Sequence, residues 1–186
     1  MPQLLILSSN ADRYRHLITS ANLPNLNIAA ESKGCDIVLG EPNLIRDALV
    51  SLPALSWAQS IWAGVEPLLD PAVRRNYTLT NARGVFGGLM SEYVIGYLLA
   101  HERKIFQRAQ AQQIKQWEHS LTGTLRGKTI GLLGVGSIGA EIARTAKFFG
   151  MTVRGYTRDS ETSTHVDTYY HGGDLLEFAN ELDYLV

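Results

Sequence analysis

Three closely spaced glycines mark the part of this 186-residue chain best suited to binding a ligand. Gly134, Gly136 and Gly139 follow the apolar run 129–133 and precede a stretch with helical periodicity. In such a turn the first glycine permits a tight bend and the second removes a side chain that would hold a pyrophosphate off the backbone. The third allows the helix to pack closely. The spacing therefore predicts a site for the pyrophosphate of a dinucleotide.

The elements expected around these glycines support this prediction. An apolar stripe at helical spacing predicts a helix ending at Gly150, and the segment 152–156 predicts a second strand. Together they occupy roughly 30 residues, as a right-handed βαβ crossover requires. Ser137 and Ile138 begin the helix, so their N–H groups and the positive end of the helix dipole would face the phosphates. A glycine-rich turn in another α/β domain is the alternative, and the complete unit favours the cofactor site over it.

The end of the second strand predicts which nicotinamide cofactor is bound. NAD-binding proteins usually place a carboxylate there for the ribose 2′-hydroxyl, whereas this chain has Tyr156, Thr157 and Arg158. A hydroxyl followed by a guanidinium suits a 2′-phosphate, because arginine offers a forked set of donors. We therefore expect NADP(H) to be favoured over NAD(H). In the alternative, Arg158 is a solvated cation and Asp159 binds the ribose of NADH.

Composition and charge disfavour several other classes. A formal net charge of −1 without a block of Lys and Arg gives no footprint for nucleic acid. The single cysteine, Cys35, excludes an internal disulfide and is expected at a strand edge rather than as a nucleophile. Segment 1–9 lacks the regions of a secretory signal, and 93–100 is far shorter than the about 20 residues of a membrane helix. We expect a cytoplasmic protein without a metal site or a membrane segment.

Strands and helices alternate along the first half of the chain. Strands are expected at 3–8, 26–30, 36–39, 57–61 and 77–80, and helices at 10–21 and 44–49. This alternation predicts a parallel sheet that is complete before the glycine turn. The expected fold class is α/β, with two doubly wound parallel-sheet domains: a flavodoxin-like domain and an incomplete Rossmann NAD(P)-binding domain.

A long helical pattern is expected between the two sheets, over 91–117. Its first part has a broad apolar face, whereas its later part is rich in Gln, Arg and Lys. We interpret it as an interdomain helix followed by an arm that packs on a second subunit, so a homodimer is expected. A solvated helix end is the alternative.

Three motifs, in order along the chain, resemble the D-isomer-specific 2-hydroxyacid dehydrogenases. They are the segment 61–66, the segment 81–94 and the glycine turn. The ending at 156–158 is similar to the NADPH-using glyoxylate and hydroxypyruvate reductase branch of that family. The resemblance implies a substrate domain at 1–92, an interdomain helix and arm at 93–120, and a partial dinucleotide-binding domain at 121–186.

The same resemblance implies a site for the carboxylate of a small 2-oxo acid or 2-hydroxy acid. Backbone N–H groups of Ala63, Gly64 and Val65 would bind it, and open amides after a strand do form anion-binding nests. Met90 could touch the nicotinamide, or it could be a core methionine under the helix start. The implied function is an NADPH-dependent oxidoreductase that reduces a glyoxylate-type or hydroxypyruvate-type acid.

The catalytic groups implied by the resemblance are a His that protonates the alkoxide, a carboxylate that tunes it and an Arg that holds the substrate. They belong to a later part of the family's cofactor domain. The apolar strand expected at 182–186 has no closing element, so we expect a truncated chain that is inactive alone. None of the five histidines or the arginines matches a catalytic motif, and we assign no catalytic residue.

Two other functions stay open at this point. One is a nucleotide-binding or partner-binding relative without catalysis, which a stop after Val186 would favour. The other is an NAD-linked formate or phosphoglycerate dehydrogenase relative, which would bind NADH more tightly than NADPH.

Overall fold

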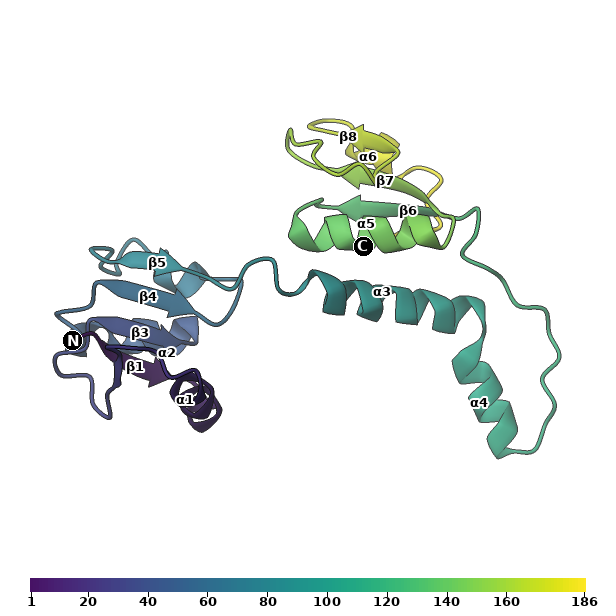
Figure 1. Cartoon of the computed structure of the whole chain (residues 1–186). Helices are drawn as coiled ribbons and strands as arrows, with labels where there is room; N and C mark the ends of the chain where they lie inside the picture. The colour runs from purple at the N-terminus through teal and green to yellow at the C-terminus, as the bar shows by residue number, and fades with distance from the viewer. The chain divides into compact units, whose positions relative to one another are not determined.

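The computed structural model describes residues 1–186, and the chain divides into two compact units, Met1–Arg83 and Gly84–Val186 (Figure 1). Each unit is built on its own sheet. The functional labels and the boundaries 1–92, 93–120 and 121–186 stay predictions.

The first unit holds a five-stranded, all-parallel sheet. Its strands are β1 (Gln3–Leu7), β2 (Asn27–Ile28), β3 (Ile37–Gly40), β4 (Trp57–Ser60) and β5 (Thr78–Thr80). Their order, β2-β1-β3-β4-β5, is that of the flavodoxin-like sheet. The helices between the strands are α1 (Ala11–Ser20), α2 (Pro42–Ala48) and the short 3-10 turns η1 (Leu49–Ser51) and η2 (Glu66–Leu68).

The core of this unit lies where α2 and η2 cover the sheet. Val38 and Ala58 from the strands pack with Ile45, Leu52 and Leu68, and all five are buried. Helix α1 contributes no buried residue, so its predicted apolar stripe is not a core face.

Cys35 is also fully buried in this unit, beside β3. Its thiol donates a hydrogen bond to the Glu31 carbonyl oxygen at 3.0 Å. Burial raises the pKa of the thiol, and Asp36 raises it further. Because the thiolate is the reactive form, this environment agrees with a structural cysteine and not with a nucleophile.

The second unit holds a four-stranded parallel sheet in the order β8-β7-β6-β9. Its strands are β6 (Thr129–Leu133), β7 (Thr152–Tyr156), β8 (Thr168–Tyr170) and β9 (Tyr184–Leu185). With β6 as the first strand, the order matches strands 3-2-1-4 of a Rossmann sheet. The predicted fold class is thereby confirmed for both sheets.

The helices of this unit are α3 (Gly87–Glu102), α4 (Ile105–Gln113), α5 (Ser137–Phe148) and α6 (Leu175–Ala179). In the core, Ile130 and Val153 of the sheet pack with Ile142 of α5 and Ile95 of α3. The Ser91 hydroxyl of α3 also donates to Thr145 Oγ1 of α5 at 2.7 Å.

The helix expected over 91–117 is wrong in extent, because it divides into α3 and α4. Lys104 lies between them in the left-handed region, at φ +53°, which ends the first helix. Its ammonium donates to Ser120 Oγ at 2.9 Å, so a distant residue stabilises the break. After α4 the chain has no regular element until β6, and the interdomain helix and arm predicted at 93–120 are therefore only partly helical.

No helix combines the length and the apolar character that crossing a membrane would require. The structure also contains no group of three or more His, Cys, Asp or Glu side chains placed to hold a metal ion.

Candidate cofactor site

The glycine turn lies at the carboxyl edge of the second sheet, between β6 and α5. Leu133 pairs with Tyr156 at the ends of the two parallel strands. Gly134 follows at φ +111°, in a region that residues with side chains rarely adopt. Its N–H donates to the Tyr156 carbonyl oxygen at 2.9 Å, which holds the turn against the end of β7.

The two later glycines of the turn have different surroundings. A side chain at Gly136 would meet no atom within 4 Å, so the space in front of the turn is open. A side chain at Gly139 would instead collide with the carbonyl oxygen of Gly134. Gly136 therefore leaves room for a ligand, and Gly139 allows α5 to approach the turn closely, as the spacing predicts.

The start of α5 presents unpaired donors to this open space. The first hydrogen bond of the helix runs from the Ala140 N–H to the Gly136 carbonyl oxygen, at 2.9 Å. The N–H groups of Ser137, Ile138 and Gly139 precede it and find no acceptor within the helix. No side chain caps the helix and its first turn holds no acidic residue. A pyrophosphate fits this arrangement, because it needs open donors and a positive helix end.

The end of β7 carries the two residues expected to select the cofactor. Arg158 is exposed and forms no ion pair. Thr157 is buried, and its hydroxyl donates to the Ser160 carbonyl oxygen at 2.7 Å. The guanidinium is thus available to a ligand, whereas the Thr157 hydroxyl is bonded within its own loop.

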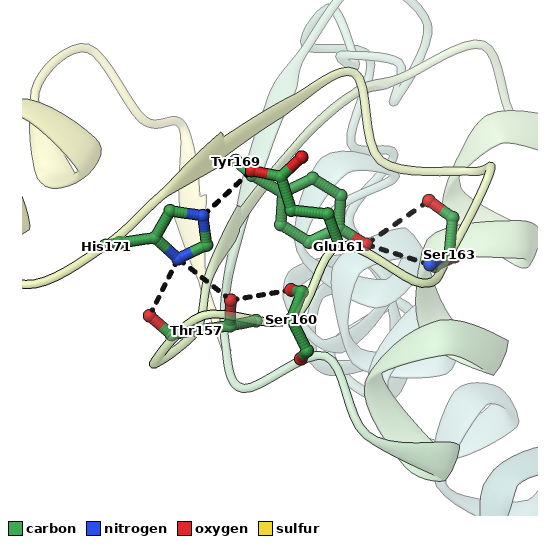
Figure 2. Close-up of polar contacts among 6 residues, drawn as sticks. All are labelled: Thr157, Ser160, Glu161, Ser163, Tyr169 and His171. Atoms are coloured by element: carbon green, nitrogen blue, oxygen red, sulfur yellow. Dashed lines mark hydrogen bonds and ion pairs between the residues drawn. The ribbon is translucent and has the colours of Figure 1, made fainter.

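A histidine from the end of β8 completes this loop (Figure 2). His171 Nδ1 lies 3.1 Å from both the carbonyl oxygen and the hydroxyl of Thr157, and its Nε2 lies 2.8 Å from Glu161 Oε1. The hydrogen bond to Glu161 and that to the Thr157 backbone raise the pKa of His171. No local motif pointed to this histidine, because its partners lie ten and more residues earlier in the chain.

The loop expected to bind a carboxylate follows β4 in the first unit. Ala63 and Gly64 are exposed, and the N–H groups of residues 63–65 donate to no acceptor. Asn81 Nδ2 holds the loop through the Ala63 carbonyl oxygen at 2.6 Å. The Glu66 carboxylate lies close by, since a Cβ on Gly64 would be 2.7 Å from its Oε2. The N–H groups of residues 63–65 are thus open to a ligand, and the Glu66 carboxylate lies beside them.

Met90 lies in the first turn of α3 and is 39% exposed. Its contact with a nicotinamide stays a prediction.

The strand order and the glycine turn of the second unit define a Rossmann-type nucleotide-binding fold. The profile of the D-isomer specific 2-hydroxyacid dehydrogenase NAD binding domain matches residues 95–186. The chain belongs to the D-isomer-specific 2-hydroxyacid dehydrogenase family.

Relatives of known name agree with this membership. A crystal structure of a family protein from Aeromonas salmonicida subsp. salmonicida A449 is 37% identical, with a TM-score of 0.92 over 99% of this chain and 62% of that one. Hydroxyphenylpyruvate reductase of Plectranthus scutellarioides is 27% identical over 86% of this chain and 52% of its own length. A glyoxylate/hydroxypyruvate reductase of Arabidopsis thaliana is 27% identical over 93% of this chain and 56% of its own length. The chain thus spans little more than half the length of these curated relatives.

Proposed function

We propose that the protein is an oxidoreductase that reduces a small 2-oxo acid, of the glyoxylate or hydroxypyruvate type, to the 2-hydroxy acid with NADPH. The observation that carries the proposal is the open turn at Gly136, with uncapped N–H groups at the start of α5. When bound, the nicotinamide supplies the hydride that reduces the substrate carbonyl. Gly134, Gly136 and Gly139, with the N–H groups of Ser137 and Ile138, would hold the pyrophosphate.

The choice of NADPH over NADH rests on the end of β7. Arg158 is exposed and unpaired, so its forked donors could receive a 2′-phosphate. Thr157 would contribute by shaping the loop, because its hydroxyl is already bonded to Ser160. Asp159, the residue that would favour NADH in the alternative, is the next residue along and is also exposed.

The substrate class rests on the loop after β4. Three successive N–H groups, at Ala63, Gly64 and Val65, are without acceptors on an exposed bend. Such a set suits one carboxylate. The names of the relatives above include reductases of hydroxyphenylpyruvate and of glyoxylate or hydroxypyruvate, which all carry a carboxylate next to the carbonyl group.

No residue of the 186 is assigned to general acid catalysis. The one histidine–carboxylate ion pair, His171 with Glu161, lies at the ends of β7 and β8, where the adenosine side of a dinucleotide would be expected. We therefore propose that the 186-residue chain alone binds the cofactor without turning over.

A second copy of the chain is the proposed partner. The segment between α3 and β6 exposes five large apolar side chains, at Ile105, Phe106, Ile114, Trp117 and Leu121. So many exposed apolar side chains in one segment support an association surface, and we propose a homodimer.

Fluorescence titration of the 186-residue chain with NADPH and with NADH tests the cofactor assignment. We expect saturable binding of both and tighter binding of NADPH. Absorbance at the nicotinamide band, followed with glyoxylate or hydroxypyruvate, tests the assignment of residues. Rapid NADPH oxidation by this chain would show that it contains a catalytic acid that we have not assigned. Binding of neither nucleotide would overturn the function.

A further inference from the structure

Thr157 and His171, fourteen positions apart in the sequence, lie next to each other at the ends of β7 and β8. Tyr156 pairs with Tyr170 at the last position of the two strands. The Thr157 N–H extends this pairing by donating to the Tyr170 carbonyl oxygen at 3.1 Å. His171 is the next residue, so its side chain meets Thr157 at the same carboxyl edge that carries Arg158.

The hydrogen bonds around His171 define where its protons lie. The Thr157 hydroxyl uses its proton to donate to Ser160, so it can only accept from Nδ1, as can the Thr157 carbonyl oxygen. Nδ1 therefore carries a proton. Nε2 faces the Glu161 carboxylate at 2.8 Å, which is also an acceptor. If only Nδ1 carried a proton, the lone pair of Nε2 would face the Glu161 carboxylate, and neither could donate. The network is therefore complete only for the imidazolium.

The network closes a loop whose exposed tip is Arg158 and Asp159. Thr157 and Glu161, on either side of the tip, both bind the same imidazole ring (Figure 2). The Tyr169 hydroxyl holds the chain further on, through Ser163 N at 3.0 Å and Ser163 O at 3.2 Å. The Tyr169 ring also stacks on His171, with 6.3 Å between ring centroids and 5° between planes. The loop is thus anchored while Arg158 is left free.

The charges at this tip are closely balanced. Arg158 and protonated His171 are positive, and Asp159 and Glu161 are negative; the two carboxylates are the charges that act on His171. If the histidine loses its proton, one cation faces two carboxylates. A ligand that brings a doubly charged phosphate would then be disfavoured, whereas one that brings a ribose hydroxyl would be affected much less.

We propose that His171, through its bonds to Thr157 and Glu161, holds the 157–161 loop so that Arg158 can receive the 2′-phosphate of NADPH. It is a positioning residue for cofactor selection, and the proposal rests on the function proposed above. The raised pKa of His171 agrees with the protonated form that the geometry requires.

The test measures the dissociation constants of NADPH and NADH for wild type and for His171→Gln between pH 6 and pH 8. Glutamine can keep one hydrogen bond but carries no charge. For the variant at pH 6 we expect NADPH to bind about fivefold more weakly, as for one partly exposed charge. NADH should change by less than about twofold. Because the variant is compared with wild type at the same pH, the titration of the 2′-phosphate itself affects both equally and cancels.

His165→Gln is the matched control. His165 lies in the same loop between β7 and β8, but its ring makes no hydrogen bond or ion pair. Glu161→Gln is the second variant: it leaves His171 in place and should lower the pH at which the His171 ring titrates by NMR. The preference for NADPH should weaken at that same lower pH.

The outcomes separate the two proposals. If wild type shows no preference for NADPH, the cofactor assignment fails and this inference fails with it. If wild type prefers NADPH but folded His171→Gln keeps the same NADPH to NADH ratio at every pH, only the role of His171 is overturned. Should His171→Gln not fold, the pH profiles of wild type and Glu161→Gln decide, since coincident profiles would contradict the role.

Discussion

The carbonyl oxygen of Gly134 occupies the space into which a side chain on Gly139 would have to extend. Helix α5 can therefore approach the turn only because residue 139 has no Cβ. Gly136, between them in the sequence, faces open space and has a φ of −80° that any residue can adopt. The turn thus contains two glycines that the fold needs, Gly134 for its positive φ and Gly139 for its close contact, and one, Gly136, that only a ligand would need.

This difference gives a paired prediction. Gly139→Ala should destabilise the second unit by about 1–3 kcal/mol, because the obstructing atom belongs to the backbone. Gly136→Ala should unfold at the wild-type temperature and yet bind NADPH at least about tenfold more weakly, because its methyl group enters the ligand space. Thermal unfolding and fluorescence titration measure both effects. Gly96→Ala, at an exposed position within α3, is the control and should keep full affinity; unchanged affinity in Gly136→Ala would argue against a pyrophosphate at the turn.

Arg158→Gln tests the source of cofactor selection. We expect NADPH to bind about tenfold more weakly and NADH to be unaffected, because only the 2′-phosphate uses the guanidinium. Arg144→Gln removes a cation that pairs with Glu141 on α5 and should change neither affinity. If Asp159→Asn weakens NADH while Arg158→Gln leaves NADPH untouched, the chain selects NADH.

The pair of His171 with Glu161 also predicts how stability depends on pH. The folded-state pKa of His171 is raised, first by its hydrogen bond to Glu161. The pair therefore stabilises the fold fully below the ordinary histidine pKa of about 6.5, and this contribution is lost as pH rises through the folded-state value. Urea unfolding at several pH values should show wild type and His171→Gln differing most in mild acid and converging in alkali. A difference that grows with pH would contradict the assignment.

Asp167 anchors the far end of the loop between β7 and β8, directly before β8. Its carboxylate accepts from Lys147 Nζ at 2.7 Å and from the Val153 N–H at 2.7 Å. Burial opposes ionisation, but these hydrogen bonds prevail and lower its pKa. Asp167→Asn should cost about 1 kcal/mol of unfolding free energy at neutral pH, a low figure because the side chain is 39% exposed.

The contribution of Asp167 should disappear as pH falls through its folded-state pKa, because the protonated carboxyl no longer attracts Lys147. Asp47→Asn serves as the control, because its pair with the adjacent Arg46 is exposed and should contribute little. Equal losses in both variants would show that the Asp167 contacts add nothing specific.

The βαβ unit could be predicted from the sequence because its signals are local. A continuous apolar run predicted β6, an apolar stripe at helical spacing predicted α5, and the strand that follows predicted β7; Gly150, at φ +76°, ends α5 where the pattern expected it. The order of the first sheet also agrees with its predicted class.

Features that depend on distant residues could not be predicted in this way. Neither glycine nor proline marks the break at Lys104, which Ser120 stabilises from sixteen residues away. Strand β8 has three residues and was not expected, so nothing in the pattern placed His171 beside Thr157. The Thr157 hydroxyl is likewise held by contacts within the loop, to the Ser160 carbonyl oxygen and to His171 Nδ1.

Two ion pairs hold the loop between β7 and β8, Asp167 with Lys147 and His171 with Glu161, and their stabilising effects depend on pH in opposite directions. The Asp167 pair is lost in strong acid, when the carboxylate is protonated, and the His171 pair is lost in alkali, when the imidazole loses its charge. Both are fully engaged only between roughly pH 4 and pH 6.5, the ordinary pKa values of the two residue types. As pH rises further, through the folded-state pKa of His171, the contacts of His171 are lost while those of Asp167 remain, so alkali would loosen the 157–161 loop without unfolding the sheet.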